Sequence, residues 1–333
     1  MGFFSAADTV ASNHIVKIDY LLPMSGEQQL QRWTHAQLQP YVLYLHDAVT
    51  IDACFGGLYF SPILSSSRSV VSAKGIGFGK PPSIEAWEEA IRELFLPGFN
   101  ISAAMSLTLE RPFQKELDIW IELPYPLETS QSFGVLQEQP INFALQPEGR
   151  MVALSWWIDQ VMENCAAINI THPASLVKLR GFVWAKSSIP PTDKELIKRV
   201  AEKIHALQLQ FLWSMNYGSG EAIHGYEYGF DIISLRSTYM GQGARGIDWM
   251  KSALHFADAY HFGVTVWGDE RVSPYQTLDF LNTVSDFGTN IFHIYDLPIL
   301  QIYEWYHNKN PLYVYVYAFS KGAYGKILRP ALQ

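Results

Sequence analysis

The chain has 333 residues, of which 48% are hydrophobic and only 17% are charged. This balance supplies enough apolar side chains for a large core and excludes an intrinsically disordered chain. The formal net charge of −8 and the lack of a basic run argue against a nucleic-acid partner, because neutralising phosphates requires clustered Lys and Arg. No stretch approaches the roughly 18 uninterrupted apolar residues of a membrane span. We therefore expect a globular protein without nucleic-acid or membrane partners.

Short apolar runs alternate with longer segments of helical period, as in parallel strands joined by crossover helices. Eight runs have this character, and eight strands close a barrel. The predicted strands are His14–Leu22, Ala53–Ser61, Leu117–Tyr125, Leu179–Trp184, Gln210–Asn216, Asp231–Tyr239, Gly263–Asp269 and Asn290–Asp296. The sequence thus predicts an α/β protein with one (β/α)8 TIM-barrel domain over residues 1–333. Within it, residues 1–13 form an N-terminal extension and residues 301–333 a closing segment.

Helical periods fall between these strands. The predicted helices are Ser83–Phe95, Val152–Ile168, Thr192–Leu207, Ile247–Tyr260 and Pro274–Phe287. Thr192 precedes Glu195 by three residues, which predicts a capping box. Long insertions after strands 2 and 3, at residues 63–82 and 127–150, should build the rim of the barrel's C-terminal end. The aromatic tail after Gln301 predicts a closing helix with a covering strand or loop.

Alternation within the third predicted strand selects Glu122 as a candidate catalytic residue. In Leu117–Tyr125 the aliphatic residues Ile119 and Ile121 alternate with Trp120 and Glu122, and we expect the aliphatic residues to face the helices. Glu122 then points into the barrel near the C-terminal end, from which this fold draws its active-site groups. The alternative is a structural carboxylate paired with an arginine.

The seventh predicted strand supplies the second catalytic candidate. In Gly263–Asp269 the same alternation turns Trp267 and Asp269 inward, and Glu270 follows at the end of the strand. Glu122 and Asp269 are therefore the predicted catalytic carboxylates across the mouth of the barrel.

Polar and aromatic residues gather at the ends of the other predicted strands. Indole rings cover the apolar face of a sugar, while amides, guanidinium groups and carboxylates bind its hydroxyls. In the first strand, Lys17 and Asp19 alternate with Ile18 and Tyr20, so Asp19 is either half of an internal ion pair or a site acid. The predicted substrate-binding residues are Asp19, Tyr125, Trp184, Lys186, Trp213, Asn216, Arg236, Trp267, Glu270 and Tyr295. The predicted ligand is a poly- or oligosaccharide.

The sequence gives little sign of a metal or cofactor site. Cys54 and Cys165 lie in apolar or helical patterns typical of buried free thiols. The histidines lack metal-ligand spacing. The glycine-rich run at residues 75–80 lacks the spacing of a phosphate loop. We therefore expect no metal and no cofactor.

Several short motifs give the chain a resemblance to a known family. They are Ile119–Pro126 with its Pro-Tyr-Pro ending, Arg150 followed by Trp156-Trp157-Ile158-Asp159, Gly181-Phe182-Val183-Trp184, Phe211-Leu212-Trp213, Tyr228-Gly229-Phe230-Asp231 and Asp269-Glu270-Arg271. In this order, over most of the chain, they resemble domain of unknown function 4855, an uncharacterised prokaryotic family regarded as a glycoside-hydrolase-like barrel. The resemblance implies the same barrel and a carbohydrate-active function. Relatives are often exported, but residues 1–13 lack the features of a signal peptide, so the compartment stays open.

The chain departs from that family's pattern on the active face. The pattern carries Glu at the position of Ser187 and tends to carry Glu where this chain has Thr265 and Trp267. The Gln-Pro-Asn of the sixth strand is here replaced by the three residues from Arg236. The resemblance therefore implies a divergent member in which the expected acids are lost or moved.

Three functions remain open from the sequence. The first is a glycoside hydrolase, with Glu122 and Asp269 as acid and base or nucleophile. The second is a non-catalytic barrel that binds a glycan or serves in an oligomer or larger assembly. The third is a lyase or isomerase that holds a sugar acid through Arg236 and Lys186.

Overall fold

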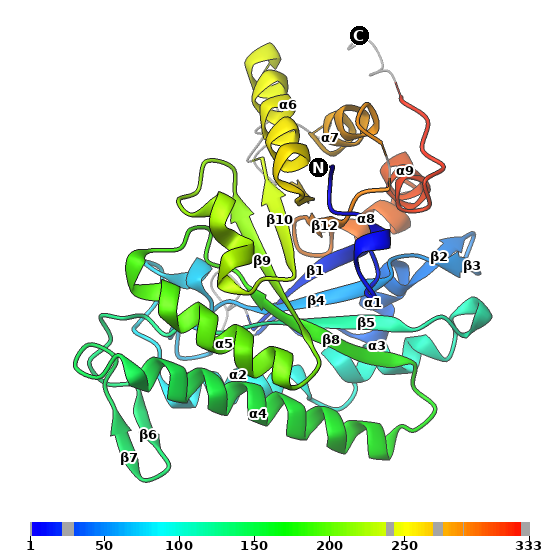
Figure 1. The fold of residues 1–333 in the computed structure, drawn as a ribbon. Helices are drawn as coiled ribbons and strands as arrows, with labels where there is room; N and C mark the ends of the chain where they lie inside the picture. The colour runs from blue at the N-terminus through cyan, green and yellow to red at the C-terminus, as the bar shows by residue number, and fades with distance from the viewer. Residues whose placement is uncertain (1, 22–29, 238–242, 269–275, 289, 328–333) are drawn as a thin grey trace.

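The computed structural model describes residues 2–21, 30–237, 243–268, 276–288 and 290–327. Eight parallel strands form a closed barrel in chain order, and the last pairs with the first (Figure 1). They are β1 (His14–Tyr20), β4 (Gly57–Pro62), β5 (Leu117–Glu122), β8 (Val177–Trp184), β9 (Gln210–Asn216), β10 (Ile232–Arg236), β11 (Gly263–Trp267) and β12 (His293–Asp296). Each overlaps one predicted strand, so the predicted (β/α)8 barrel is confirmed.

Helices surround the barrel, and two antiparallel hairpins extend from it. The helices are α1 (His35–Val42), α2 (Ile84–Leu94), α3 (Asn100–Thr108), α4 (Glu148–Thr171), α5 (Lys194–Ala206), α6 (Gly243–Tyr260), α7 (Gln276–Ser285), α8 (Gln301–His307) and α9 (Pro311–Ser320). The hairpins are β2 (Leu43–His46) with β3 (Val49–Ala53), and β6 (Gly134–Leu136) with β7 (Gln139–Ile141). Figure 1 shows α2, α4 and α5 below the strands and α6, α7 and α9 above them.

The start of α5 differs from the prediction. No capping box forms between Thr192 and Glu195, because the N-cap residue is Asp193 and its side chain makes no cap hydrogen bond. The Thr192 hydroxyl instead donates to Glu128. The Asp193 carboxylate accepts a hydrogen bond from Arg150, whose Nη2 lies 2.5 Å from Oδ1. A buried ion pair therefore takes the place of the expected cap.

The C-terminal segment, expected to form a closing helix with a covering strand or loop, contains the two helices α8 and α9, and the described residues after α9 include no strand. Asn310 caps α9 by accepting a hydrogen bond from the backbone N–H of Leu312. Tyr313 and Tyr317 stand four residues apart and share one face of α9. Both rings stack on Tyr44 of β2, with centroid separations of 5.4 and 3.5 Å. The aromatic spacing is thus that of a helix packed on the β2–β3 hairpin.

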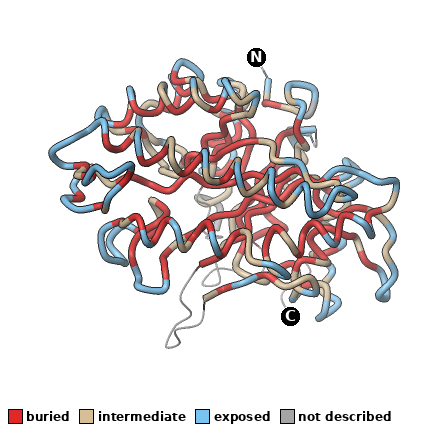
Figure 2. The backbone as a smooth tube through the Cα atoms, turned by 90° about the horizontal axis from the view of Figure 1, so that it is seen from below, coloured by how far each residue is buried: buried red, intermediate tan, exposed pale blue. Residues whose placement is uncertain are grey.

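The barrel separates two apolar cores. The larger core lies between the strands and the helices, and the smaller fills the barrel interior. Figure 2 shows buried residues through the centre of the molecule and exposed residues on its outer helices and loops. The interior core consists of Phe4, Ala11, Ile15, Tyr59, Trp120, Val183, Leu212, Ile232, Phe292 and Ile294. Trp120 therefore faces inward, as the alternation in its strand predicted.

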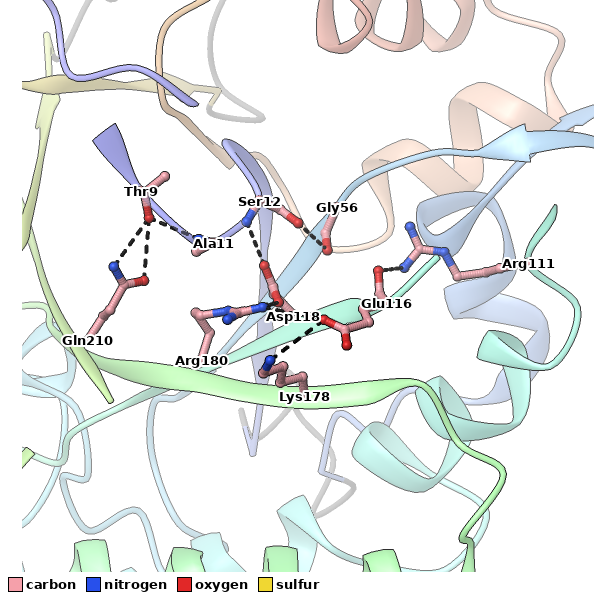
Figure 3. A network of polar contacts seen from close by, with 10 residues as sticks. All are labelled: Thr9, Ala11, Ser12, Gly56, Arg111, Glu116, Asp118, Lys178, Arg180 and Gln210. Atoms are coloured by element: carbon pink, nitrogen blue, oxygen red, sulfur yellow. Dashed lines mark hydrogen bonds and ion pairs between the residues drawn. The ribbon is translucent and has the colours of Figure 1, made fainter. Parts of the chain in front are cut away.

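A polar network closes the floor of the barrel, which is the end at the N-termini of the strands (Figure 3). Asp118 accepts hydrogen bonds from the backbone N–H of Ser12 at 2.6 Å and from Nε and Nη2 of Arg180 at 3.0 and 2.6 Å. A bulge after Ile119 leaves Arg180 without a paired residue on β5. The next residue of β8 is Gly181. A Cβ at this position would lie 2.0 Å from the carbonyl oxygen of Gln210, so the close approach of the two strands requires glycine. This network fastens the N-terminal segment across the floor.

Two histidines pair outside the interior core, near the same end of the barrel. His14 of β1 and His293 of β12 are register partners, and their rings stack with centroids 5.4 Å apart. His293 is fully buried and also meets the edge of Phe319. Burial, followed by the neighbouring His14, holds the pKa of His293 well below its ordinary value. The neutral imidazole is therefore the form that fits the fold.

This pKa predicts a loss of stability in mild acid. The folded-state pKa of His293 lies below the unfolded value of about 6.5. The stabilisation that His293 contributes to the unfolding free energy is therefore complete above that pH. It is lost as the pH falls, and the unfolding free energy then changes by up to about 1.4 kcal/mol per pH unit. His293→Phe keeps an aromatic ring and should flatten the dependence of the unfolding free energy on pH below about 6.5. The same substitution at exposed His172 should leave the slope unchanged. Equal slopes in all three proteins would contradict this assignment.

Candidate functional site

The barrel interior becomes charged at its mouth, which is the end at the C-termini of the strands. Lys17 and Asp19 of β1, Glu122 of β5, Arg236 of β10 and Asp296 of β12 gather there. They continue the inward-facing rows whose lower members are apolar. Glu122 is fully buried, whereas the side chains of Asp296 and Arg236 are 11% and 18% exposed. The charges therefore form a layer that begins inside the barrel and reaches solvent.

Asp296 is the centre of an ion-pair cluster. Its Oδ1 lies 3.2 Å from Nζ of Lys17, and its Oδ2 contacts Nη2 of Arg236. Burial opposes the charge of Asp296, but Lys17, Arg236 and Lys74 hold its pKa well below the ordinary value. Burial likewise opposes the charge of Lys17, but Asp19 and Asp296 raise the pKa of this lysine above its usual value. Lys17 and Asp296 are therefore both ionised at neutral pH.

Glu122 has a hydroxyl donor on each of its carboxylate oxygens. The Tyr59 hydroxyl donates to Oε2 at 2.5 Å, and the Ser72 hydroxyl donates to Oε1. Burial and then the charge of Glu122 raise the pKa of Tyr59 well above its ordinary value, so the phenol keeps its proton. An ion pair of Glu122 with an arginine, the structural alternative, does not occur within the described residues. Two donors from different elements therefore fix the orientation of this carboxylate.

Lys74 enters the mouth from the long loop after β4. It lies in a short 3-10 helix, Ala73–Gly75, and Ser72 caps this helix by accepting a hydrogen bond from the backbone N–H of Lys74. Nζ of Lys74 lies 3.9 Å from Oδ2 of Asp296, and its side chain is 26% exposed. Burial of the ammonium group and the charge of Lys17 lower the pKa of Lys74 to about 8. The loop thus contributes a cation and a hydroxyl to the site.

Sequence reasoning missed Tyr59, Ser72 and Lys74. The residue pattern of β4 contains the signal for Tyr59, because this residue and Ser61 occupy alternate positions at the end of a barrel strand. No such signal exists for Ser72 and Lys74, since a loop has no period that fixes where its side chains point.

Three predicted sugar-binding aromatics do not reach the mouth, which corrects their expected positions. Trp184, Trp213 and Tyr295 are buried in the core between the barrel and the helices. Trp213 stacks on Phe230, and Trp184 meets the edge of Tyr125. The residue that precedes each of them in the sequence points into the barrel and belongs to the interior core. Both faces of these strands are apolar, as is usual in a parallel barrel, so alternation does not reveal which face is which.

Tyr125 and Lys186 belong to a separate polar cluster around Asp193. The Tyr125 hydroxyl donates to Oδ2 of Asp193 at 3.0 Å, and Nζ of Lys186 contacts both the same oxygen, at 3.3 Å, and the Tyr125 hydroxyl. Arg150 contacts Oδ1 of Asp193 and also donates to the backbone oxygens of Pro126 and Thr192. This cluster joins the segments after β5 and β8 to α4 and α5, which is a structural role.

The remaining predicted residues divide between the mouth and the undescribed part of the chain. Asn216 and Arg236 are register partners at the ends of β9 and β10, and Trp267 of β11 is paired with Asp296 of β12. Asn216 and Trp267 are both half-buried. With Asp19 and Glu122, these residues share one end of the barrel. Asp269 and Glu270 lie outside the described residues.

A groove of about 680 Å³ lies elsewhere, between the β2–β3 hairpin and helices α8 and α9. Tyr44, Trp305 and Tyr313 are among its lining residues. It lies outside the barrel and contains no barrel strand end, so the charged mouth is the better candidate for an active site. Within the described ranges, no group of three or more His, Cys, Asp or Glu residues is arranged to hold a metal ion. The described helices include none with the length and apolar character needed to span a membrane.

The Asp193 cluster predicts a large difference between two arginine substitutions. Arg150→Met removes the closest cation from a fully buried carboxylate and should lower the unfolding free energy by about 3–5 kcal/mol. Arg199→Met removes the exposed partner of Glu148, and the change there should stay below about 1 kcal/mol. Urea denaturation measures both values. Similar losses in the two variants would be inconsistent with a structural role for the cluster.

Comparison with known proteins places the chain in a family and gives distant likenesses in fold. A mutant tryptophan synthase α-subunit from Pyrococcus furiosus is 8% identical with a TM-score of 0.39, covering 95% of this chain and 99% of its own. The carboxyl transferase domain of Rhizobium etli pyruvate carboxylase is 8% identical with a TM-score of 0.43, covering 98% of this chain and 50% of its own. No curated protein matches. Residues 19–317 match the family described as Domain of unknown function (DUF4855). Since this match spans most of the sequence, the chain belongs to the DUF4855 family.

Proposed function

We propose that the barrel mouth is a carbohydrate site and that the chain is a glycoside hydrolase whose carboxylates are Glu122 and Asp269. The observation that carries the proposal is the change inside the barrel from an apolar core to charged residues at the mouth. Active sites of this fold form at that end.

The cost of burying these charges favours a functional explanation. Taking ions out of water costs several kcal/mol each, and a buried ion pair is often no more stabilising than apolar side chains of similar volume. Lys17 and Asp296 occupy positions that a larger apolar core would fill. Clusters of this kind with shifted pKa values are typical of functional sites.

The chemistry of a glycosidase suits the surroundings of Glu122. A glycosidase needs one carboxyl group to protonate the leaving oxygen and a second to attack the sugar or activate water. The hydroxyls of Tyr59 and Ser72 each donate to one oxygen of Glu122 and orient its carboxylate, so Glu122 is the proposed nucleophile or base. Asp269, two residues after the end of β11, is the proposed acid. Trp267 is the proposed stacking platform, because its indole is half-buried at the mouth.

A second candidate function, a glycan-binding barrel without catalysis, is favoured by a different observation. Each described carboxylate of the mouth already has partners: Asp19 pairs with Lys17, Asp296 with three cations, and Glu122 with two hydroxyls. A carboxylate held in ion pairs is a poor proton donor. The same groups still hydrogen-bond sugar hydroxyls.

Matched substitutions separate the two functions. Glu122→Gln and Asp269→Asn should each lower kcat by about 10²- to 10⁴-fold on a substrate found in a panel of polysaccharides and aryl glycosides. Because each change keeps the side-chain shape, binding measured by calorimetry should survive. Glu138→Gln, at an exposed hairpin turn, is the control that should leave kcat unchanged.

Two outcomes would contradict the hydrolase proposal. Turnover that both site variants retain would remove these residues from the chemistry. Binding without turnover in the wild-type protein would instead support the glycan-binding function.

A further inference from the structure

We propose that the sugar bound at this mouth carries an anionic group, and that Lys74 and Arg236 are the residues that bind it. The inference rests on the proposed carbohydrate site and extends it to a substrate class, the acidic sugars. It follows from how the charges of the mouth are paired and from which of them reach solvent.

The described ion-pair cluster has one more cation than carboxylates. Lys17, Lys74 and Arg236 face Asp19 and Asp296. The third carboxylate, on Glu122, is engaged by hydroxyl groups. Within the described residues, Lys74 therefore shares its ion-pair partner, Asp296, with two other cations.

Lys74 is the cation with the loosest pairing. Lys17 and Arg236 already contact the two oxygens of Asp296, whereas the ammonium of Lys74 stays 3.9 Å away. Its side chain is also the most exposed of the three, at 26%, compared with 18% for Arg236 and 4% for Lys17. A ligand that enters from solvent therefore meets Lys74 and Arg236 before it meets Lys17.

Arg236 retains an unused donor. Its Nη2 binds Asp296, but its buried Nε has no hydrogen-bond partner within the described residues. A guanidinium group presents several donors in a planar fork that suits carboxylate and sulfate oxygens. A buried donor without a partner is costly, so an incoming oxygen that accepts from Nε gains binding free energy.

The protonation of Lys74 supplies a specific readout. Burial and the charge of Lys17 lower the pKa of Lys74 to about 8. An anion beside this ammonium favours its charged form and raises the pKa. Binding of an acidic sugar at pH 8 should therefore be accompanied by proton uptake. At pH 6, where Lys74 is already protonated, the uptake should vanish.

Trigalacturonate and its methyl ester are suitable probes, because they differ in charge and share the sugar backbone. Calorimetry at pH 8 in buffers of different ionisation enthalpy measures affinity and proton uptake together. We expect wild-type protein to bind the acid more tightly than the ester, with proton uptake for the acid alone. Lys74→Met should weaken binding of the acid by about 10- to 100-fold and change binding of the ester little.

Two further variants serve as controls. Lys74→Arg should keep most of the affinity but lose the proton uptake, since arginine is always charged. Lys80→Met removes an exposed cation of the same loop and should change neither the affinity for the acid nor the proton uptake. A sulfated galactotriose tests the source of the anion: tighter binding than trigalacturonate identifies a sulfated sugar, and weaker binding identifies a uronate.

Equal affinity for the acid and its ester would overturn the inference while leaving the carbohydrate site intact. Unchanged binding of the acid by Lys74→Met would overturn it as well. The inference would also be overturned if neutral oligosaccharides bind and no acidic trisaccharide does. If no oligosaccharide binds at all, the proposed function itself fails.

Discussion

The closure of the sheet by pairing of β12 with β1 is the constraint on which the structure depends. Once eight strands enclose a fixed volume, alternate residues on each strand have to fill it, and this produces the apolar interior core from Ile15 to Ile294. Asp118 and Arg180 complete the floor with a polar network that also fastens the N-terminal segment. The two ends of the barrel are thus chemically different. The floor is tied by contacts that stabilise the fold, and the mouth gathers charges whose burial opposes it.

The charged mouth remains compatible with a stable fold because its ions neutralise one another. Asp296 is the shared partner of Lys17, Arg236 and Lys74, and its carboxylate connects β12 to β1, β10 and the loop after β4. Removal of that carboxylate would leave Lys17 with Asp19 alone and would take from Arg236 its described ion-pair partner, whereas Lys74, at 3.9 Å, is the most loosely paired of the three. The same arrangement leaves Lys74 and Arg236, the two more exposed cations of the mouth, within reach of a ligand.

The sequence predicted the barrel because each strand is a short apolar run followed by a helical period. It also predicted the inward orientation of Glu122, because Ile119 and Ile121 mark the outward face of β5. The misplaced aromatics, such as Trp213, lie on strands that are apolar on both faces, where alternation carries no information. Lys74 escaped prediction for another reason: its place beside Asp296 depends on the path of a loop and on a contact between residues 222 positions apart. Local patterns specify strands and their faces, but only tertiary packing specifies such contacts.

The central claim is that the mouth of this barrel receives a carbohydrate, and a crystal structure of the Glu122→Gln variant with a bound oligosaccharide tests it most directly. The account predicts a sugar ring against Trp267, with ligand oxygens within hydrogen-bond distance of Arg236 and Lys74. An oligosaccharide bound only in the aromatic groove beside Trp305 and Tyr313, with an empty mouth, would contradict it.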